Sequence, residues 1–137
     1  MDNKERYRRY IETVWHEHNP EGAREYIAED IVDHAAPPGQ GAGLAGLIET
    51  FRMFLDAFPD AHIDIEDLLA DGDKIVARIV LRGTHQGPFF GIPATGRPVV
   101  VPGIHLMRYA DGKMTEHWSN SDDLGMMGQL GVIPPLG

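Results

Sequence analysis

The hydrophobic side chains of this sequence change their spacing partway along the chain, and this change limits the folds open to it. Up to about residue 58, apolar residues recur every three or four positions, which is typical of amphipathic helices. From residue 63 onward, runs rich in Ile, Val and Leu are separated by short turn signals, which is typical of strands. Helices followed by an antiparallel sheet predict an α+β fold with the helices on one face of the sheet.

The first half predicts three helices. The first covers roughly Asn3 to His18, and the second begins at Asn19-Pro20-Glu21, where Asn suits the N-cap and Pro the first helical position. A short extended piece at 31–34 and a Gly/Pro-rich loop at 35–43 follow. A strongly amphipathic third helix is expected from Leu44 to Phe58.

The second half predicts four strands and a last short helix. Asp111-Gly112 is the strongest hairpin signal in the chain. Asp122 and Gly131 are suited to cap the two ends of a final helix. The strands are expected at residues 63–69, 74–84, 99–109 and 113–121. A curled sheet with helices across its open side encloses a cavity.

Composition narrows the possible partners. The 137 residues suffice for one domain, 1–137, with one core. The 12 Lys and Arg against 21 Asp and Glu leave a net charge of −9, which opposes binding to nucleic acid and to anionic membranes. The lack of Cys excludes disulfides, thiolate metal sites and cysteine nucleophiles. No apolar run approaches the ~18 residues of a membrane span and the N-terminus is charged, so we expect a cytoplasmic protein.

Several short motifs occur in a characteristic order. They are FPD at 58–60, GDKIVAR at 72–78, GTHQG at 83–87, GIPATGR at 91–97, DGK at 111–113, EHW at 116–118 and QLG at 129–131. In this order they resemble the SnoaL-like polyketide cyclases (ester cyclases) of the nuclear transport factor 2-like superfamily. The resemblance implies a cone-shaped, strongly curved antiparallel sheet whose open face is covered by N-terminal helices. It also implies a cofactor-free enzyme that closes a ring of a polyketide ester by intramolecular aldol condensation, and a homodimer or larger homo-oligomer.

This chemistry needs a base that takes a proton from an activated carbon and an acid that supports the carbonyl oxygen. In the cyclases an essential Asp follows the last hairpin turn and a His precedes it. The His of the family matches His105, whereas the Asp position falls on Ser119. A serine hydroxyl does not replace a carboxylate as a base, so Ser119 counts against the family's cyclase reaction in this chain.

The hairpin predicts a register for the last two strands. A two-residue loop at Asp111-Gly112 without a β-bulge places His105 opposite Trp118, with Asp122 on the same face. We therefore predict His105 and Asp122 as the catalytic pair. Two simpler interpretations stay open: Asp122 as the N-cap of the last helix, and His105 as a hydrogen-bonded core residue.

Aromatic residues predict a pocket for a small hydrophobic carbonyl compound. Two alternatives stay open: the Phe residues of the helices are simply core residues, and His34 and His85 are loop anchors. No His-x-x-x-His or Glu-x-x-His pair is present on a predicted helix, so neither a metal nor a cofactor is expected. The predicted substrate-binding residues are Trp15, His34, Phe54, His85, Phe89, Phe90, Trp118 and Asn120.

Three functions fit these patterns. The first is an acid–base enzyme of cyclase, isomerase or dehydratase type that acts on a carbonyl compound. The second is a non-catalytic ligand-binding or dimerisation module, which Ser119 in place of the family's Asp favours. The third is hydrolysis of an epoxide or ester, with Asp122 activating water.

Overall fold

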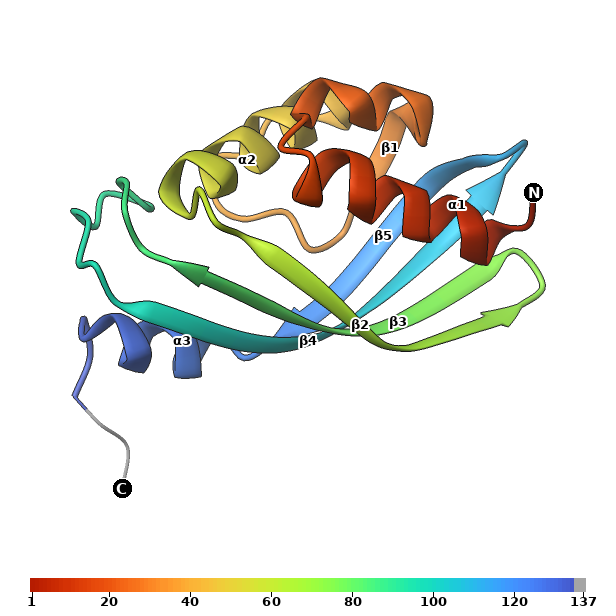
Figure 1. The fold of residues 1–137 in the computed structure, drawn as a ribbon. Coiled ribbons are helices and arrows are strands. Elements are labelled where there is room, and N and C mark those ends of the chain that lie inside the picture. The colour runs from red at the N-terminus through yellow and green to blue at the C-terminus, as the bar shows by residue number, and fades with distance from the viewer. Residues whose placement is uncertain (135–137) are drawn as a thin grey trace.

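A curved five-stranded sheet with helices over one face forms the protein, as the computed structural model shows (Figure 1). The structure describes residues 1–134. The predicted α+β cone is confirmed. The elements are α1 (Asn3–Tyr10), the π-helical turn η1 (Ile11–His16), the 3-10 helix η2 (Pro20–Glu25), β1 (Ile27–Asp33), α2 (Gly43–Ala57), β2 (His62–Asp71), β3 (Lys74–Thr84), β4 (Pro98–Ala110), β5 (Lys113–Ser121) and α3 (Asp123–Leu130). Within the described residues, no helix is both long and apolar enough to span a membrane.

The strands follow the order β1-β5-β4-β3-β2. Strands β2 to β5 are antiparallel, as predicted, whereas β1 pairs in parallel with β5. The sequence pattern indicated only a brief extended piece at 31–34 and no partner for it. The parallel pairing escapes local reasoning because the two strands lie at opposite ends of the chain.

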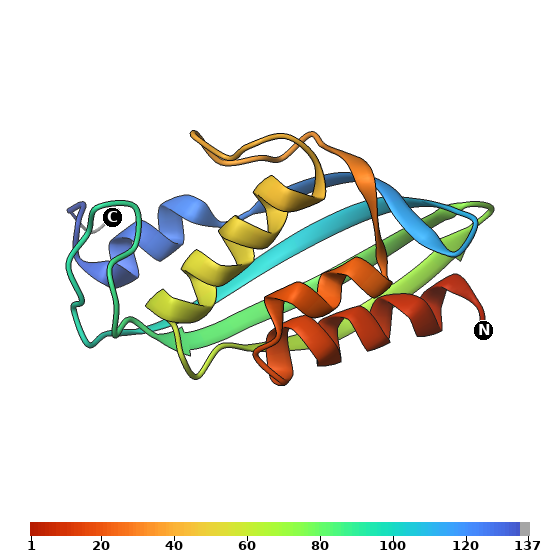
Figure 2. The same ribbon diagram turned by 90° about the horizontal axis from the view of Figure 1, so that it is seen from above.

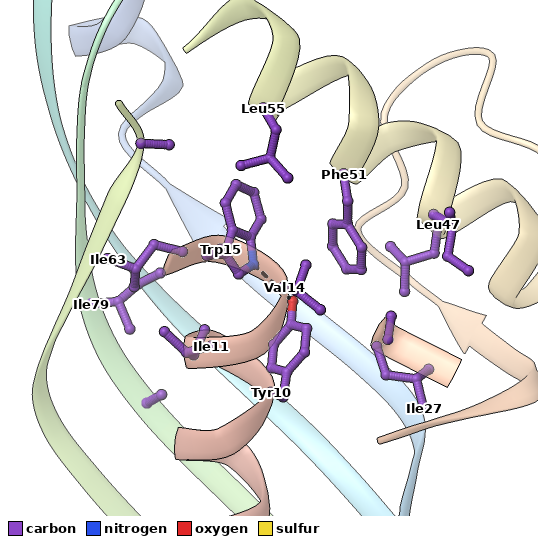
Figure 3. Packing of buried hydrophobic residues seen from close by; sticks show 14 of the residues in the cluster. Tyr10, Ile11, Val14, Trp15, Ile27, Leu47, Phe51, Leu55, Ile63 and Ile79 are labelled. Atoms are coloured by element: carbon purple, nitrogen blue, oxygen red, sulfur yellow. Dashed lines mark hydrogen bonds between the residues drawn. The ribbon is translucent and has the colours of Figure 1, made fainter. Parts of the chain in front are cut away.

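The core lies between the helices and the concave face of the sheet. Figure 2 shows α1 in red and α2 in yellow lying across the strands. The apolar faces of α2 and of the η1 turn meet inward-facing residues of the sheet, such as Ile63 and Ile79 (Figure 3). The 3/4 spacing of apolar residues in the sequence therefore marks the buried helix faces correctly.

The first helix is not α-helical throughout. Residues Ile11–His16 form a π-helical turn, in which backbone hydrogen bonds run over five residues, such as Glu17 N–H to the Glu12 carbonyl at 2.9 Å. The sequence predicted one continuous α-helix here. The π-turn rotates later residues relative to earlier ones and thereby brings Tyr10 and Trp15 together.

A β-bulge interrupts the pairing of β4 with β5. Tyr109 pairs with Met114, but the next pair is Arg108 with Glu116, so Thr115 has no partner. The extra residue reverses the faces of all later residues of β5. His105 consequently lies opposite Ser119 rather than Trp118, and the register predicted from the hairpin is wrong.

Two glycines test the packing of helices α2 and α3. A Cβ on Gly46 would collide with the backbone of Gly41, whereas a Cβ on Gly128 would meet nothing within 4 Å. We expect Gly46→Ala to lower the free energy of unfolding by about 1–3 kcal/mol through overpacking. Gly128→Ala should raise it by about 0.5–1 kcal/mol, because Ala loses less backbone entropy in a helix. Urea unfolding measures both. Equal responses of the two variants would contradict the close packing of residues 41–46.

Candidate functional site

A cavity of about 870 Å³ lies between the helices and the concave face of the sheet. Much of its wall is aromatic or aliphatic, including Trp15, Phe51, Phe54, Phe89 and Phe90. None of the residues that line it, all within 1–134, is Lys or Arg. Its polar wall residues are the phenols Tyr7 and Tyr10 together with Asp33, Gln40, Thr50, His105, His117, Ser119, Asn120, Ser121 and Asp123.

Three of these polar residues form a hydrogen-bonded chain across three strands. Asp33 ends β1, His117 lies on β5 and His105 on β4. His117 Nδ1 lies 2.8 Å from Asp33 Oδ1, and His117 Nε2 lies 2.8 Å from His105 Nδ1. The parallel register of β1 with β5 makes Asp33 the direct neighbour of His117, which allows the first of these bonds.

The loop after β1 holds the carboxylate in place. The Ala35 backbone N–H donates to Asp33 Oδ1 at 3.0 Å, and Gln40 Nε2 donates to Asp33 Oδ2 at 3.0 Å. Thr50 on α2 donates to Gln40 Oε1 at 2.6 Å and so orients the amide. Both oxygens of Asp33 therefore have donors, which fixes the carboxylate rotamer.

These bonds determine the charge of Asp33. Burial by itself would raise the pKa of Asp33, but hydrogen bonds from His117 and Gln40 outweigh burial and hold the pKa below its ordinary value. Asp33 is therefore ionised near neutral pH and accepts hydrogen bonds only.

The charge of Asp33 sets the protons of both imidazoles. The hydrogen between Asp33 and His117 belongs to His117 Nδ1, because an ionised carboxylate has none to give. When His117 is neutral it accepts at Nε2, and the second hydrogen then belongs to His105 Nδ1. This assignment leaves a free lone pair on Nε2 of His105.

His105 is held neutral. Burial, together with the neighbouring His117, lowers the pKa of His105 to about 3, while the charge of Asp33 acts in the opposite direction. Within residues 1–134, no three acidic or His side chains converge as metal ligands. The cavity wall thus carries an ionised carboxylate hydrogen-bonded to two imidazoles in series.

Comparison with known proteins identifies the family of the chain. The family described as SnoaL-like polyketide cyclase matches residues 5–130. The chain belongs to this family.

Two cyclases and one solved structure are similar to it. Aklanonic acid methyl ester cyclase DnrD of Streptomyces peucetius is 39% identical over 72 residues, which are 53% of this chain and 50% of that protein. Nogalonic acid methyl ester cyclase of Streptomyces nogalater is 40% identical over 107 residues, 78% of each chain. TsrD from Streptomyces laurentii has a TM-score of 0.86 at 28% identity, covering 97% of this chain and 99% of that one. The matches to the first curated relatives thus span about half the length of those proteins.

The structure brings several residues predicted for the SnoaL-like site into one cavity. His105 lines it at the sheet, and the aromatic side chains Trp15, Phe54, Phe89 and Phe90 form much of the opposite wall. Asn120 also lies in the cavity wall. Phe89 and Phe90, which were predicted as substrate-binding residues, line the cavity although they lie in a loop.

Asp122 does not accompany His105. Its carboxylate accepts a hydrogen bond from the Gly125 backbone N–H at 2.9 Å and caps α3, which was the simpler interpretation of this residue. It is not part of the cavity wall, and the partner of His105 is His117. The predicted pairing of His105 with Asp122 is therefore corrected.

Three further predicted residues lie outside the cavity wall. Because of the bulge, Trp118 faces the other side of the sheet, where its ring stacks on His34 at 4.7 Å. His34 also bonds Glu116 at 2.9 Å. His85 is fully buried and braces the loop that follows β3, accepting from the Thr95 backbone N–H at 3.2 Å. The contacts of these three residues therefore lie outside the cavity wall.

Sequence reasoning missed Asp33 and His117. His117 was assigned to the wrong face because the segment Thr115–Ser121 has no apolar alternation that would reveal a bulge. The sequence pattern predicts His34 as a substrate-binding residue, whereas the structure places its neighbour Asp33 in the cavity wall. A detectable signal was the Gln40 amide within the loop, a polar group suited to hold a buried carboxylate.

Because His105 is neutral when folded, removal of its imidazole should change how stability depends on pH. The unfolded chain binds a proton at His105 below about pH 6.5, and the folded protein does so only near pH 3. The free energy of unfolding therefore falls as the pH falls from 6.5 toward 3, because protonation of His105 stabilises only the unfolded chain in this range. We expect the unfolding free energy of the wild type to fall between pH 6 and 4.5 more steeply than that of His105→Gln, by up to about 1.4 kcal/mol per pH unit. Urea unfolding at several pH values measures the slopes, and equal slopes would contradict the neutral His105.

Proposed function

We propose that this protein is an acid–base catalyst that closes a ring in a small, mostly apolar carbonyl ester by an intramolecular aldol reaction. The observation that supports this best is the hydrogen-bonded chain from Asp33 through His117 to His105 at the wall of an apolar cavity. The names of the similar cyclases support the same reaction class.

In the proposed reaction, His105 Nε2 is the base. It takes a proton from a carbon activated by adjacent carbonyl groups. The Nδ1 proton of His105 passes to His117 Nε2, and the resulting positive charge lies beside the ionised Asp33. The buried ion pair stabilises the accepted proton, although His105 alone is a weak base.

The remaining steps return the proton. The carbanion attacks a second carbonyl carbon of the same molecule, and a new carbon–carbon bond forms. The oxygen of that carbonyl receives the proton back from His105 Nε2, while His117 returns the Nδ1 proton. All atoms of the substrate are retained, so no metal, nucleotide or redox group is needed.

The hydrogen-bonded chain that begins at Asp33 supplies the carboxylate that Ser119 does not provide. Ser119 lies directly opposite His105, in the register position where the family's Asp is expected. Here the carboxylate reaches His105 through His117 instead. The proton-accepting unit is thus an Asp–His–His relay rather than a carboxylate beside the imidazole.

The cavity wall favours a neutral substrate. The residues that carry formal charge in it, Asp33 and Asp123, are acidic, and no basic side chain is among its lining residues within 1–134. A free carboxylate would meet repulsion without a partner. We propose a methyl ester of a polyketide acid, of the kind named for the related cyclases, as the substrate.

Three variants test this function with nogalonic and aklanonic acid methyl esters as substrates. His105→Ala should lower kcat by about 10²- to 10⁴-fold. Asp33→Asn removes the charge that holds the transferred proton and should lower kcat by roughly 10²-fold or more. Asp122→Asn should keep activity, because Asn caps a helix about as well as Asp. Chromatography of the ring-closed product and the melting temperature of each variant are the measurements.

The outcomes separate the alternatives. Loss of activity in Asp122→Asn with retention in Asp33→Asn would assign the catalytic carboxylate to Asp122. Release of methanol without ring closure would indicate an ester hydrolase. Tight binding of both esters without chemical change would indicate a binding module.

We also propose that the protein is a homodimer. Helices α1 and α2 cover one face of the sheet (Figure 1). The outer face of β4 carries exposed apolar side chains, with Ile104 54% and Val100 43% exposed. Exposed apolar side chains on an uncovered sheet face are typical of protein–protein contacts. A second copy of the chain would bury them, as the family resemblance implies.

Light scattering coupled to size exclusion tests the dimer. The wild type should have twice the mass of one chain, and Ile104→Glu the mass of one chain, because a charge in the contact would be buried without a partner. Leu124→Glu is the matched control, since Leu124 is 57% exposed but lies on α3. A wild type that runs as a monomer, or an unchanged mass for Ile104→Glu, would contradict this interface.

A further inference from the structure

The cavity has a second polar feature, on its helical side. Trp15 Nε1 donates a hydrogen bond to the Tyr10 hydroxyl oxygen at 3.2 Å (Figure 3). Both side chains are 8% exposed and both line the cavity. Figure 3 shows this polar contact surrounded by the apolar side chains of Val14, Phe51 and Leu55.

The π-helical turn makes this contact possible. In a regular α-helix, residues five positions apart point about 140° away from each other. The turn at Ile11–His16 closes over five residues instead, so the side chains of Tyr10 and Trp15 come to lie on one side. Turns of this kind are rare and occur frequently at functional sites.

The Tyr10 hydroxyl retains an unused donor. A phenol has one hydrogen to donate and two lone pairs to accept with. One lone pair is taken by Trp15, and within residues 1–134 this is the only hydrogen bond of the hydroxyl. Burial raises the pKa of Tyr10, and the negative charge of Asp33 raises it further, while the hydrogen bond from Trp15 lowers it. The pKa stays above its ordinary value, so the phenol keeps its proton near neutral pH.

A molecule in the cavity would lie between two functional groups. The helical side contributes the Tyr10 hydroxyl, and the sheet side contributes His105. A hydrogen bond that Trp15 donates to the phenol oxygen polarises the O–H and makes it a better donor. In an apolar cavity such a donor stabilises a developing negative charge strongly.

We propose that Tyr10 donates a hydrogen bond to the substrate carbonyl oxygen that becomes an enolate oxygen, and that Trp15 is the residue that positions it. This inference rests on the proposed function. His105 Nε2 takes the proton from the carbon beside that carbonyl, and the C–H electron pair moves into a new C=C bond. The negative charge then lies on the oxygen held by Tyr10. When the new carbon–carbon bond forms, the C=O is restored and Tyr10 still carries its own proton.

Removal of the hydroxyl tests the role of Tyr10 directly. Tyr10→Phe keeps the ring and should lower kcat on the methyl esters by about 10²-fold, with a much smaller change in KM, because the bond strengthens only when charge develops. Trp15→Phe should lower kcat less. Tyr26→Phe is the matched control: its hydroxyl pairs with Thr13 at 3.3 Å outside the cavity wall, and kcat should stay unchanged.

A second variant separates chemistry from folding. Tyr10→Phe leaves the buried Trp15 N–H without an acceptor, which costs stability by itself. The double variant Tyr10→Phe/Trp15→Phe removes both polar groups and should regain stability without regaining kcat. Recovery of kcat together with stability would overturn the proposal, as would wild-type kcat in Tyr10→Phe.

The carbonyl stretch of a bound ketone tests the hydrogen bond without turnover. With 1-tetralone as the probe, the infrared band should lie at lower frequency in the wild type than in Tyr10→Phe. Identical bands would overturn the assignment of Tyr10. If the wild type closes neither ester, the proposed function fails, and the infrared comparison alone decides whether Tyr10 binds a carbonyl oxygen.

Discussion

The extra residue in β5, Thr115, decides which side chains reach the cavity. Side chains alternate along a strand, so one inserted residue exchanges the two faces of everything that follows. With the bulge, His117 and Ser119 face inward and Trp118 faces outward. Without it, the imidazole of His117 would lie on the outer face and could contact neither His105 nor Asp33. The hydrogen-bonded chain from Asp33 to His105 depends on this one irregularity.

The second requirement is the parallel edge strand. β1 brings Asp33 beside His117, and the loop after it returns Gln40 to the same carboxylate. A buried carboxylate without donors would take up a proton and lose its charge. The Gln40 and Ala35 hydrogen bonds therefore serve the chemistry as well as the fold, because they keep Asp33 ionised beside the two imidazoles.

The cavity places polar groups on opposite walls and leaves most of the space between them apolar. The sheet supplies a proton acceptor, and the helices supply a phenol that stays protonated. Low polarity strengthens each hydrogen bond that a ligand makes and penalises charges that lack partners. The same property is the reason for proposing a neutral ester rather than an acid as the substrate.

The sequence by itself determined most of the architecture. Helical spacing up to Phe58, the Asp111-Gly112 hairpin and the Asp122 cap follow from local patterns, because periodicity and capping act over a few residues, whereas His105 follows from the family resemblance. Only the tertiary structure decided what His105 contacts. Asp33 and His117 are 84 residues apart in sequence, and their contact depends on strand pairing and on a bulge in a segment whose polar residues specify no register. Such contacts arise from the packing of the whole chain, so no short stretch of the sequence predicts them.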